Sequence, residues 1–119
     1  MFGEGPRVTG PARVAVVAAG TSDVPVAREA LKGTGVQTAA VATGFPAGLT
    51  SLKVKLDETR ETVEAGAQEI DMVIARDAFL MGDDARVAYE IEAVKEACGP
   101  AHLKAVSYTH LTLPTILRV

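Results

Sequence analysis

The 119-residue chain is poor in the residues that several classes of binding protein require. Aromatic residues make up 4% of it and tryptophan is missing, which argues against a stacking platform for nucleic-acid bases. The single cysteine, Cys98, excludes an internal disulfide framework and is typical of a reducing compartment. The chain has twelve Lys and Arg residues and fifteen Asp and Glu residues. It therefore lacks the basic excess expected of a protein that binds nucleic acid or an anionic membrane.

Signals for export, membrane insertion and metal binding are equally weak. No apolar run approaches the roughly 20 residues needed to cross a bilayer, and the N-terminus carries charge and glycine instead of a signal-peptide core. The two histidines, His102 and His110, have no cysteine or acidic partner at metal-ligand spacing, so we expect no metal site. These features predict a soluble, cytoplasmic protein.

What the sequence does contain is an alternation of strand and helix patterns. Apolar runs at residues 14–19, 36–43, 69–74 and 102–106 predict strands buried on both faces, as in parallel sheets. Helices are expected between them, at about residues 25–32, 51–65 and 84–98. This order predicts an α/β fold with about four parallel strands and right-handed crossovers.

The two longer helices each carry an apolar stripe at spacings of four, three and four. The charged residues of the first of them, Lys55 included, are expected to face solvent, whereas Cys98 is expected in the core. The stripes consist of Leu52, Leu56, Thr59 and Val63, and of Val87, Ile91, Val94 and Cys98.

The two ends of the chain do not share this regular pattern. Residues 1–10 are punctuated by glycine and proline and predict an irregular lead-in before a domain at 11–106. Residues 107–119 show neither period 2 nor period 3.6 and contain no further helix pattern, so we expect a poorly packed tail.

Two strand-to-helix turns are candidate ligand sites, because ligands of parallel α/β sheets bind at the carboxyl ends of strands. The first turn could hold a phosphate through backbone N–H groups, although a capped helix start is the simpler explanation of it. The second contains a glycine that would let a ligand approach the backbone, although a plain loop remains the alternative. The residues concerned are Gly20, Thr21, Ser22 and Asp23 in the first turn, and Thr43, Gly44 and Phe45 in the second.

The strand at residues 69–74 carries a third candidate site. Period-2 alternation places Glu69 and Asp71 on one face of a strand that should be covered, where two carboxylates are costly unless paired. Lys104 on the next strand is the natural partner for them. This pattern predicts a proton-transfer site, and a structural ion pair is the alternative.

From about residue 24 to residue 104 the chain resembles deoxyribose-phosphate aldolase. Five motifs carry the resemblance: Val-Ala-Thr-Gly-Phe-Pro from residue 41, Lys-Leu-Asp-Glu-Thr from 55, Gly-Ala-Gln-Glu-Ile-Asp-Met-Val-Ile from 66, Met-Gly-Asp from 81, and His-Leu-Lys from 102. The resemblance implies an incomplete TIM (β/α)8 barrel, since a whole barrel takes about 250 residues. It also implies reversible cleavage of 2-deoxyribose 5-phosphate to glyceraldehyde 3-phosphate and acetaldehyde through a lysine Schiff base, with no cofactor.

The same resemblance assigns roles to four residues. Asp71 matches the family's acid–base aspartate, which works through a water, and Lys104 matches a lysine that lines the site. Thr43 and Phe45 match the loop at its mouth. The family's Schiff-base lysine lies on a later Lys-Thr-Ser-Thr-Gly strand that has no counterpart here, so we expect this chain to be inactive alone. The implied partner is a small phosphorylated sugar, and a homodimer remains open.

Both ends depart from that family. In one codon choice, residues 105–115 read like a sequencing adapter in frame, so residues 107–119 are hypothesised to be a non-native tail; resequencing the source locus would test this. Residues 11–23 are similar to the first strand and phosphate loop of aminoimidazole-ribonucleotide carboxylase/mutase-like proteins and could be of foreign origin. Two alternatives therefore stay open: a nucleotide-phosphate-binding module at Gly20–Asp23, and a chimeric chain without function.

Overall fold

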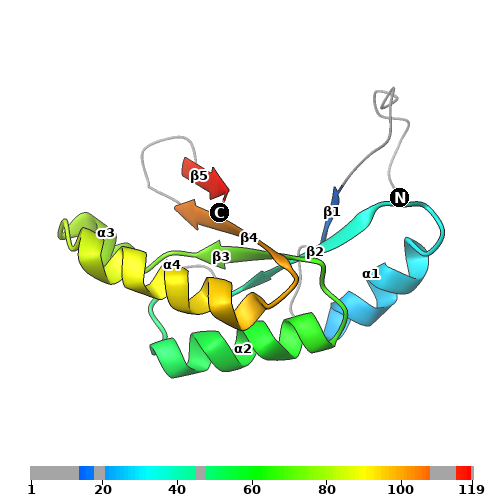
Figure 1. Cartoon of the computed structure of the whole chain (residues 1–119), viewed down its shortest axis with the longest axis horizontal. Helices are drawn as coiled ribbons and strands as arrows, with labels where there is room; N and C mark the ends of the chain where they lie inside the picture. The colour runs from blue at the N-terminus through cyan, green and yellow to red at the C-terminus, as the bar shows by residue number, and fades with distance from the viewer. Residues whose placement is uncertain (1–13, 18–20, 45–47, 108–114, 119) are drawn as a thin grey trace.

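The computed structural model describes residues 14–17, 21–44, 48–107 and 115–118. Its strands and helices alternate along most of the chain (Figure 1). In order they are β1 (Val14–Val17), the 3₁₀ turn η1 (Thr21–Asp23), α1 (Val24–Ala30), β2 (Gln37–Ala42), α2 (Leu52–Glu64), β3 (Glu69–Val73), α3 (Arg76–Leu80), α4 (Asp84–Cys98), β4 (His102–Ser107) and β5 (Thr115–Arg118).

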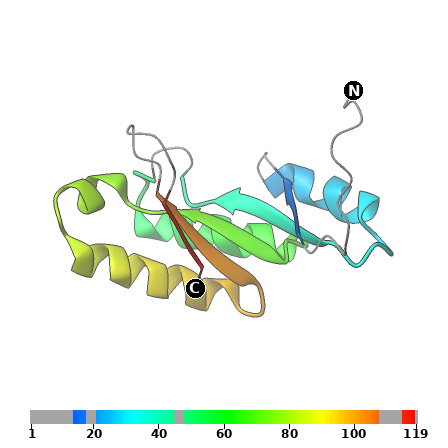
Figure 2. The same ribbon diagram turned by 90° about the horizontal axis from the view of Figure 1, so that it is seen from above.

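The strands form one open sheet in the order β1-β2-β3-β4-β5 (Figure 2). The first four are parallel, which confirms the predicted α/β fold, while β5 runs antiparallel to β4. The register places Val41 of β2 beside Asp71 of β3, and Asp71 beside Lys104 of β4. Side chains at matched positions of parallel neighbours point to the same face, so these three residues share a face of the sheet.

Helices α1, α2 and α4 lie together on the other face (Figure 1). The hydrophobic core fills the space between these helices and the sheet, and burial of apolar surface there is the main stabilising contribution. Its fully buried strand residues combine small alanines of β2 with the larger Ile70 and Met72 of β3 and Leu103 of β4. The core consists of Val24, Ala40, Ala42, Ala67, Ile70, Met72, Val94, Cys98, Ala101 and Leu103.

Each of the two long helices begins at a capping side chain. Ser51 caps α2, its hydroxyl accepting a hydrogen bond from the Val54 amide at 3.3 Å, and Asp83 caps α4 by accepting one from the Arg86 amide at 3.1 Å. Such caps satisfy amides that would otherwise lack a partner in the first turn. Cys98 lies in the core as predicted, and burial raises the pKa of its thiol to about 11. None of the helices among the described residues is long and apolar enough to span a membrane.

The structure contains two short elements that the sequence pattern did not predict. The segment after β3 contains the short helix α3, which spans five residues and is too short to show a periodic stripe. The tail contains β5, whose backbone pairs with β4 from Lys104↔Arg118 to Ser107↔Thr115. A four-residue strand on one edge needs only backbone hydrogen bonds, which a pattern search cannot detect.

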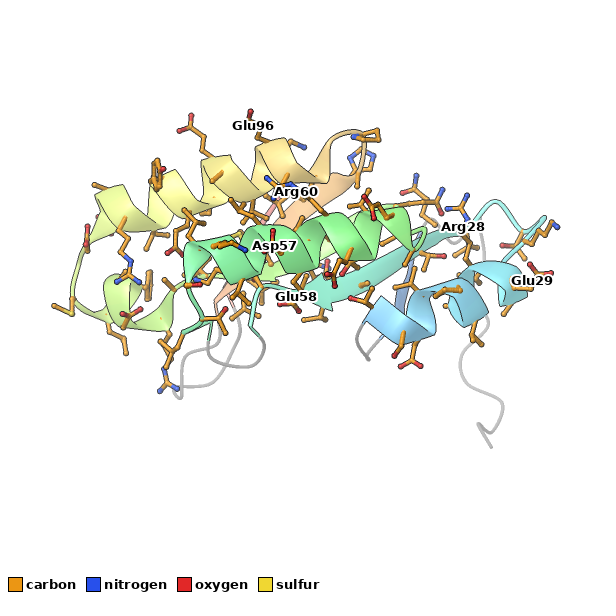
Figure 3. All side chains as sticks on the ribbon, turned by 90° about the horizontal axis from the view of Figure 1, so that it is seen from below. Arg28, Glu29, Asp57, Glu58, Arg60 and Glu96 are labelled. Atoms are coloured by element: carbon orange, nitrogen blue, oxygen red, sulfur yellow. The ribbon has the colours of Figure 1, made fainter. Side chains whose placement is uncertain are left out.

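The expectation that Lys55 faces solvent was wrong. Its side chain is fully buried, and its Nζ lies 2.7 Å from Oε2 of Glu90 on the neighbouring helix α4. By contrast, Arg60 of α2 is exposed as expected, Asp57 of α2 is half-exposed, and Glu96 of α4 is exposed on the same helical side of the molecule (Figure 3). Lys55 therefore lies on the face of α2 that packs against α4, and a cation is buried there because a carboxylate meets it.

Candidate functional site

Glu69, Asp71 and Lys104 form a charged cluster on the sheet face opposite the helices. The Lys104 Nζ lies 3.1 Å from Oδ1 of Asp71 and 3.4 Å from Oε1 of Glu69. The two carboxylates come together because residues two apart on a strand share a face, and Lys104 joins them because β4 pairs with β3 in parallel register. The structure thus brings together the three residues that the sequence pattern singled out.

In this cluster, burial and the neighbouring opposite charges shift the pKa values of Asp71 and Lys104 in opposite directions. Glu69 is 1% and Asp71 7% exposed. Burial raises the pKa of Asp71 and the Glu69 carboxylate adds to this effect, which together outweigh the opposing pull of the Lys104 ammonium. Burial alone would lower the pKa of Lys104, but the Asp71 and Glu69 carboxylates outweigh it and raise that pKa. The arrangement holds Lys104 as a cation and moves the titration of Asp71 toward neutral pH, which suits a group that exchanges protons.

Thr43 lies immediately after β2, close to the end of β3. Its hydroxyl donates a hydrogen bond to the Val73 carbonyl oxygen at 3.0 Å and accepts one from the Val73 amide at 2.9 Å. The side chain is fully buried, so its hydroxyl is already engaged by protein and does not line an open site. The second loop residue, Phe45, lies outside the described residues.

The first candidate turn shows a similar use of its hydroxyl. Thr21 Oγ1 lies 2.8 Å from Oγ1 of Thr62 on α2. Ser22 is exposed, Asp23 makes no side-chain cap, and the helix that follows has only seven residues. Gly20 lies outside the described residues. The hydrogen bond between Thr21 and Thr62 fixes this turn against α2. The described part of the turn gives no support to a phosphate site.

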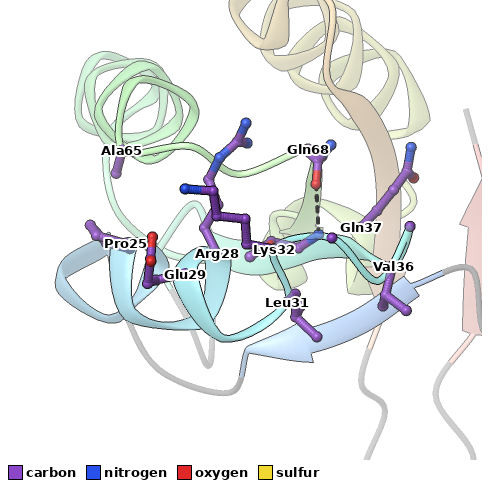
Figure 4. Close-up of a pocket in the computed structure, with 12 residues that line it drawn as sticks. Pro25, Arg28, Glu29, Leu31, Lys32, Val36, Gln37, Ala65 and Gln68 are labelled. Atoms are coloured by element: carbon purple, nitrogen blue, oxygen red, sulfur yellow. Dashed lines mark hydrogen bonds between the residues drawn. The ribbon is translucent and has the colours of Figure 1, made fainter.

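A cavity lies away from the charged cluster. It has a volume of about 620 Å³ and is bounded by α1, the start of β2 and the residue before β3 (Figure 4). Arg28 and Lys32 border it, and Gln68 accepts a hydrogen bond from the Thr38 amide at 3.1 Å. This cavity is at the amino ends of the strands, whereas ligands of parallel α/β sheets bind at the carboxyl ends. Within the described ranges, no group of three His, Cys, Asp or Glu residues could hold a metal ion.

Comparison with protein-family models gave no match. Curated deoxyribose-phosphate aldolases do match: that of Mus musculus is 48% identical over 83 residues, covering 68% of this chain and 26% of the relative. That of Metamycoplasma hominis is 46% identical over 90 residues, covering 76% of this chain and 41% of the relative.

Solved structures give the same result. A putative deoxyribose-phosphate aldolase from Coccidioides immitis matches with a TM-score of 0.69 and 32% identity, covering 76% of this chain and 36% of that one. The aldolase QR15 matches with a TM-score of 0.66 and 28% identity, covering 80% and 40%. The chain spans about a quarter to two fifths of the length of the curated relatives. It is therefore a partial deoxyribose-phosphate aldolase-like protein.

Proposed function

We propose that the chain supplies the proton-handling part of an aldolase site that cleaves 2-deoxyribose 5-phosphate reversibly to glyceraldehyde 3-phosphate and acetaldehyde. The observation that carries the proposal is the 3.1 Å contact between Lys104 Nζ and the buried Asp71 carboxylate, in a segment similar to deoxyribose-phosphate aldolases. A small phosphorylated sugar is the substrate class. The lone cysteine and mild acidity support a cytoplasmic role in deoxynucleoside breakdown.

The reaction needs an amine that forms the Schiff base and a second group that transfers protons. Schiff-base formation between an amine and a sugar aldehyde expels water, and the hydroxyl that leaves must gain a proton. Cleavage of the carbon–carbon bond takes a proton from the neighbouring hydroxyl and leaves an enamine, whose terminal carbon is then protonated. Asp71, directly or through a water, can give and take these protons, because burial raises its pKa toward neutral pH.

Lys104 serves this chemistry as a fixed cation. A nucleophilic amine must be unprotonated, and enzymes achieve this by lowering the pKa of the reactive lysine. The two carboxylates beside Lys104 have the opposite effect. The attacking amine of the proposed reaction is therefore a different lysine, at the position where the family carries it on a later strand.

Treatment of the 119-residue chain with acetaldehyde and borohydride at neutral pH should accordingly leave Lys104 unmodified. The carboxylates of Asp71 and Glu69 favour its protonated form, so Lys104 has less free amine than an ordinary lysine and is disfavoured in forming the imine that borohydride reduces. Peptide mass spectrometry reads the result, and the same assay with 2-deoxyribose 5-phosphate should show no cleavage. A reduced adduct on Lys104 or efficient turnover would contradict this assignment.

The proposal is tested by grafting the matching segment of this chain into the Mus musculus relative in place of its own 83 residues. The graft supplies Asp71 and Lys104, while the recipient supplies the remaining barrel and the reactive lysine. Release of acetaldehyde from 2-deoxyribose 5-phosphate is expected. A soluble, folded graft that shows no cleavage would overturn the proposal.

A further inference from the structure

The residue that ends β2 has an unusual backbone conformation. Thr43 has a φ of 74°, and in the described ranges no other residue except glycine has a positive φ. The left-handed region is unfavourable for a β-branched side chain, because its Cβ crowds the backbone. Such strain persists only where surrounding contacts impose it, and it gathers at functional sites.

The contacts that impose it come from the end of β3. Once Thr43 turns into the left-handed region, the backbone of β2 can no longer continue the ladder, and the last register pair is Ala42↔Met72. The Thr43 hydroxyl replaces the missing rung: it donates to the Val73 carbonyl oxygen at 3.0 Å and accepts from the Val73 amide at 2.9 Å. One buried hydroxyl thus satisfies both polar groups of the Val73 backbone that face β2.

Gly44 and Gly48, the described residues on either side of residues 45–47, also have defined contacts. The Gly44 amide donates to Oε2 of Glu58 on α2 at 3.2 Å, and the Gly48 amide donates to the Gly44 carbonyl oxygen at 2.8 Å. Gly48 lies so close to β3 that a Cβ there would overlap the Ile74 carbonyl oxygen. Gly44 is therefore held by α2 and Gly48 lies against the end of β3.

We propose that Thr43 is a positioning residue for Asp71: by fixing the Val73 peptide, it holds the end of β3 where the Asp71 carboxylate meets Lys104. Val73 follows Asp71 by two residues on the same face, so a shift of one moves the other. The role rests on the proposed function of Asp71 as the group that exchanges protons. It also explains why a residue expected to line the site instead directs its hydroxyl to the backbone.

The test replaces Thr43 in the full 119-residue chain and follows the Asp71 carboxyl carbon by NMR during a pH titration. Thr43→Val keeps the branched shape but leaves two buried backbone groups without partners, which favours opening of the strand end to water. The pKa of Asp71 should then fall toward its ordinary value, because its raised value comes first from burial. Thr43→Ser retains the hydroxyl and should titrate like the unchanged chain.

Thr59→Val is the matched control. Thr59 is also fully buried, but its hydroxyl donates to the Lys55 carbonyl oxygen at 2.7 Å within α2 and, among the described residues, makes no hydrogen bond to β3. The charged groups that face Asp71 are Glu69 and Lys104, and all three variants leave both of them unchanged. An Asp71 titration that moves equally in Thr43→Val and Thr59→Val, or in neither, would overturn the proposal.

A second measurement decides the question if Thr43→Val does not fold. In the unchanged chain and in Thr43→Ser, the Val73 amide should exchange slowly with deuterium, because Thr43 accepts its hydrogen bond. Exchange as fast as that of an exposed amide would overturn the proposal. Neither measurement needs turnover, so failure of the graft to cleave substrate and failure of Thr43 to position Asp71 can be told apart.

Discussion

Changing Asp71 to asparagine in the grafted aldolase should lower kcat for cleavage of 2-deoxyribose 5-phosphate by about 10²- to 10⁴-fold, the usual contribution of a positioned acid–base group. The amide has the shape of the carboxyl group but can neither accept a proton at working pH nor return one. The loss should fall on kcat more than on KM, because proton transfer is needed in the transition state and not for substrate binding. Steady-state measurement of acetaldehyde release gives both constants.

Asp57→Asn in the same graft is the matched control for this prediction. Asp57 is a half-exposed aspartate of α2 that pairs with Lys53 at 2.7 Å, so the same chemical change is made on the helical side of the sheet, opposite the charged cluster (Figure 3). Its kcat should equal that of the graft. If Asp71→Asn also kept the full kcat, Asp71 would not be the proton-transfer group.

Replacing Lys55 with methionine should destabilise the 119-residue chain by about 3–5 kcal/mol, the usual cost of removing one partner from a buried ion pair. The change leaves the Glu90 carboxylate, of which 6% is exposed, without its 2.7 Å partner. Arg86 lies 3.6 Å from the other Glu90 oxygen but is half-exposed, so it compensates poorly. Urea unfolding followed by circular dichroism measures the loss as a lower midpoint at unchanged slope.

Two variants separate this effect from loss of a lysine in general. Lys53→Met removes an exposed lysine two residues away on the same helix and should leave the midpoint nearly unchanged. The double change Lys55→Met with Glu90→Leu removes both charges and should recover most of the stability, since apolar replacement of a whole buried pair is often neutral. Equal midpoints for Lys55→Met and Lys53→Met would show that the buried pair does not form.

The sequence could predict the charged cluster because it depends on two simple periodicities. Alternation along β3 places Glu69 and Asp71 on one face, and the strand–helix–strand order makes β4 a parallel neighbour with Lys104 in reach. The parallel strands and helix α2 followed from equally local signals, namely continuous apolar runs and an apolar stripe at helical spacing.

Other features depend on how separate elements meet, which no local pattern contains. Lys55 reads as a surface residue until α4 brings Glu90 against it from 35 positions along the chain. The left-handed conformation of Thr43 is contrary to the preference of a β-branched residue, and only its bonds to Val73 explain it. A search for hydrophobic periodicity finds neither, since both are polar groups satisfied by tertiary contacts.

The most direct test of the central claim, that Asp71 is a buried carboxyl group paired with Lys104, is an NMR titration of Asp71 with and without Lys104→Met. In the unchanged chain the pKa of Asp71 should lie above its ordinary value, because burial outweighs the attraction of the ammonium. Removing that cation should raise the pKa further, since Lys104 favours the ionised form. An Asp71 that titrates at its ordinary value and does not respond to Lys104→Met would contradict the account.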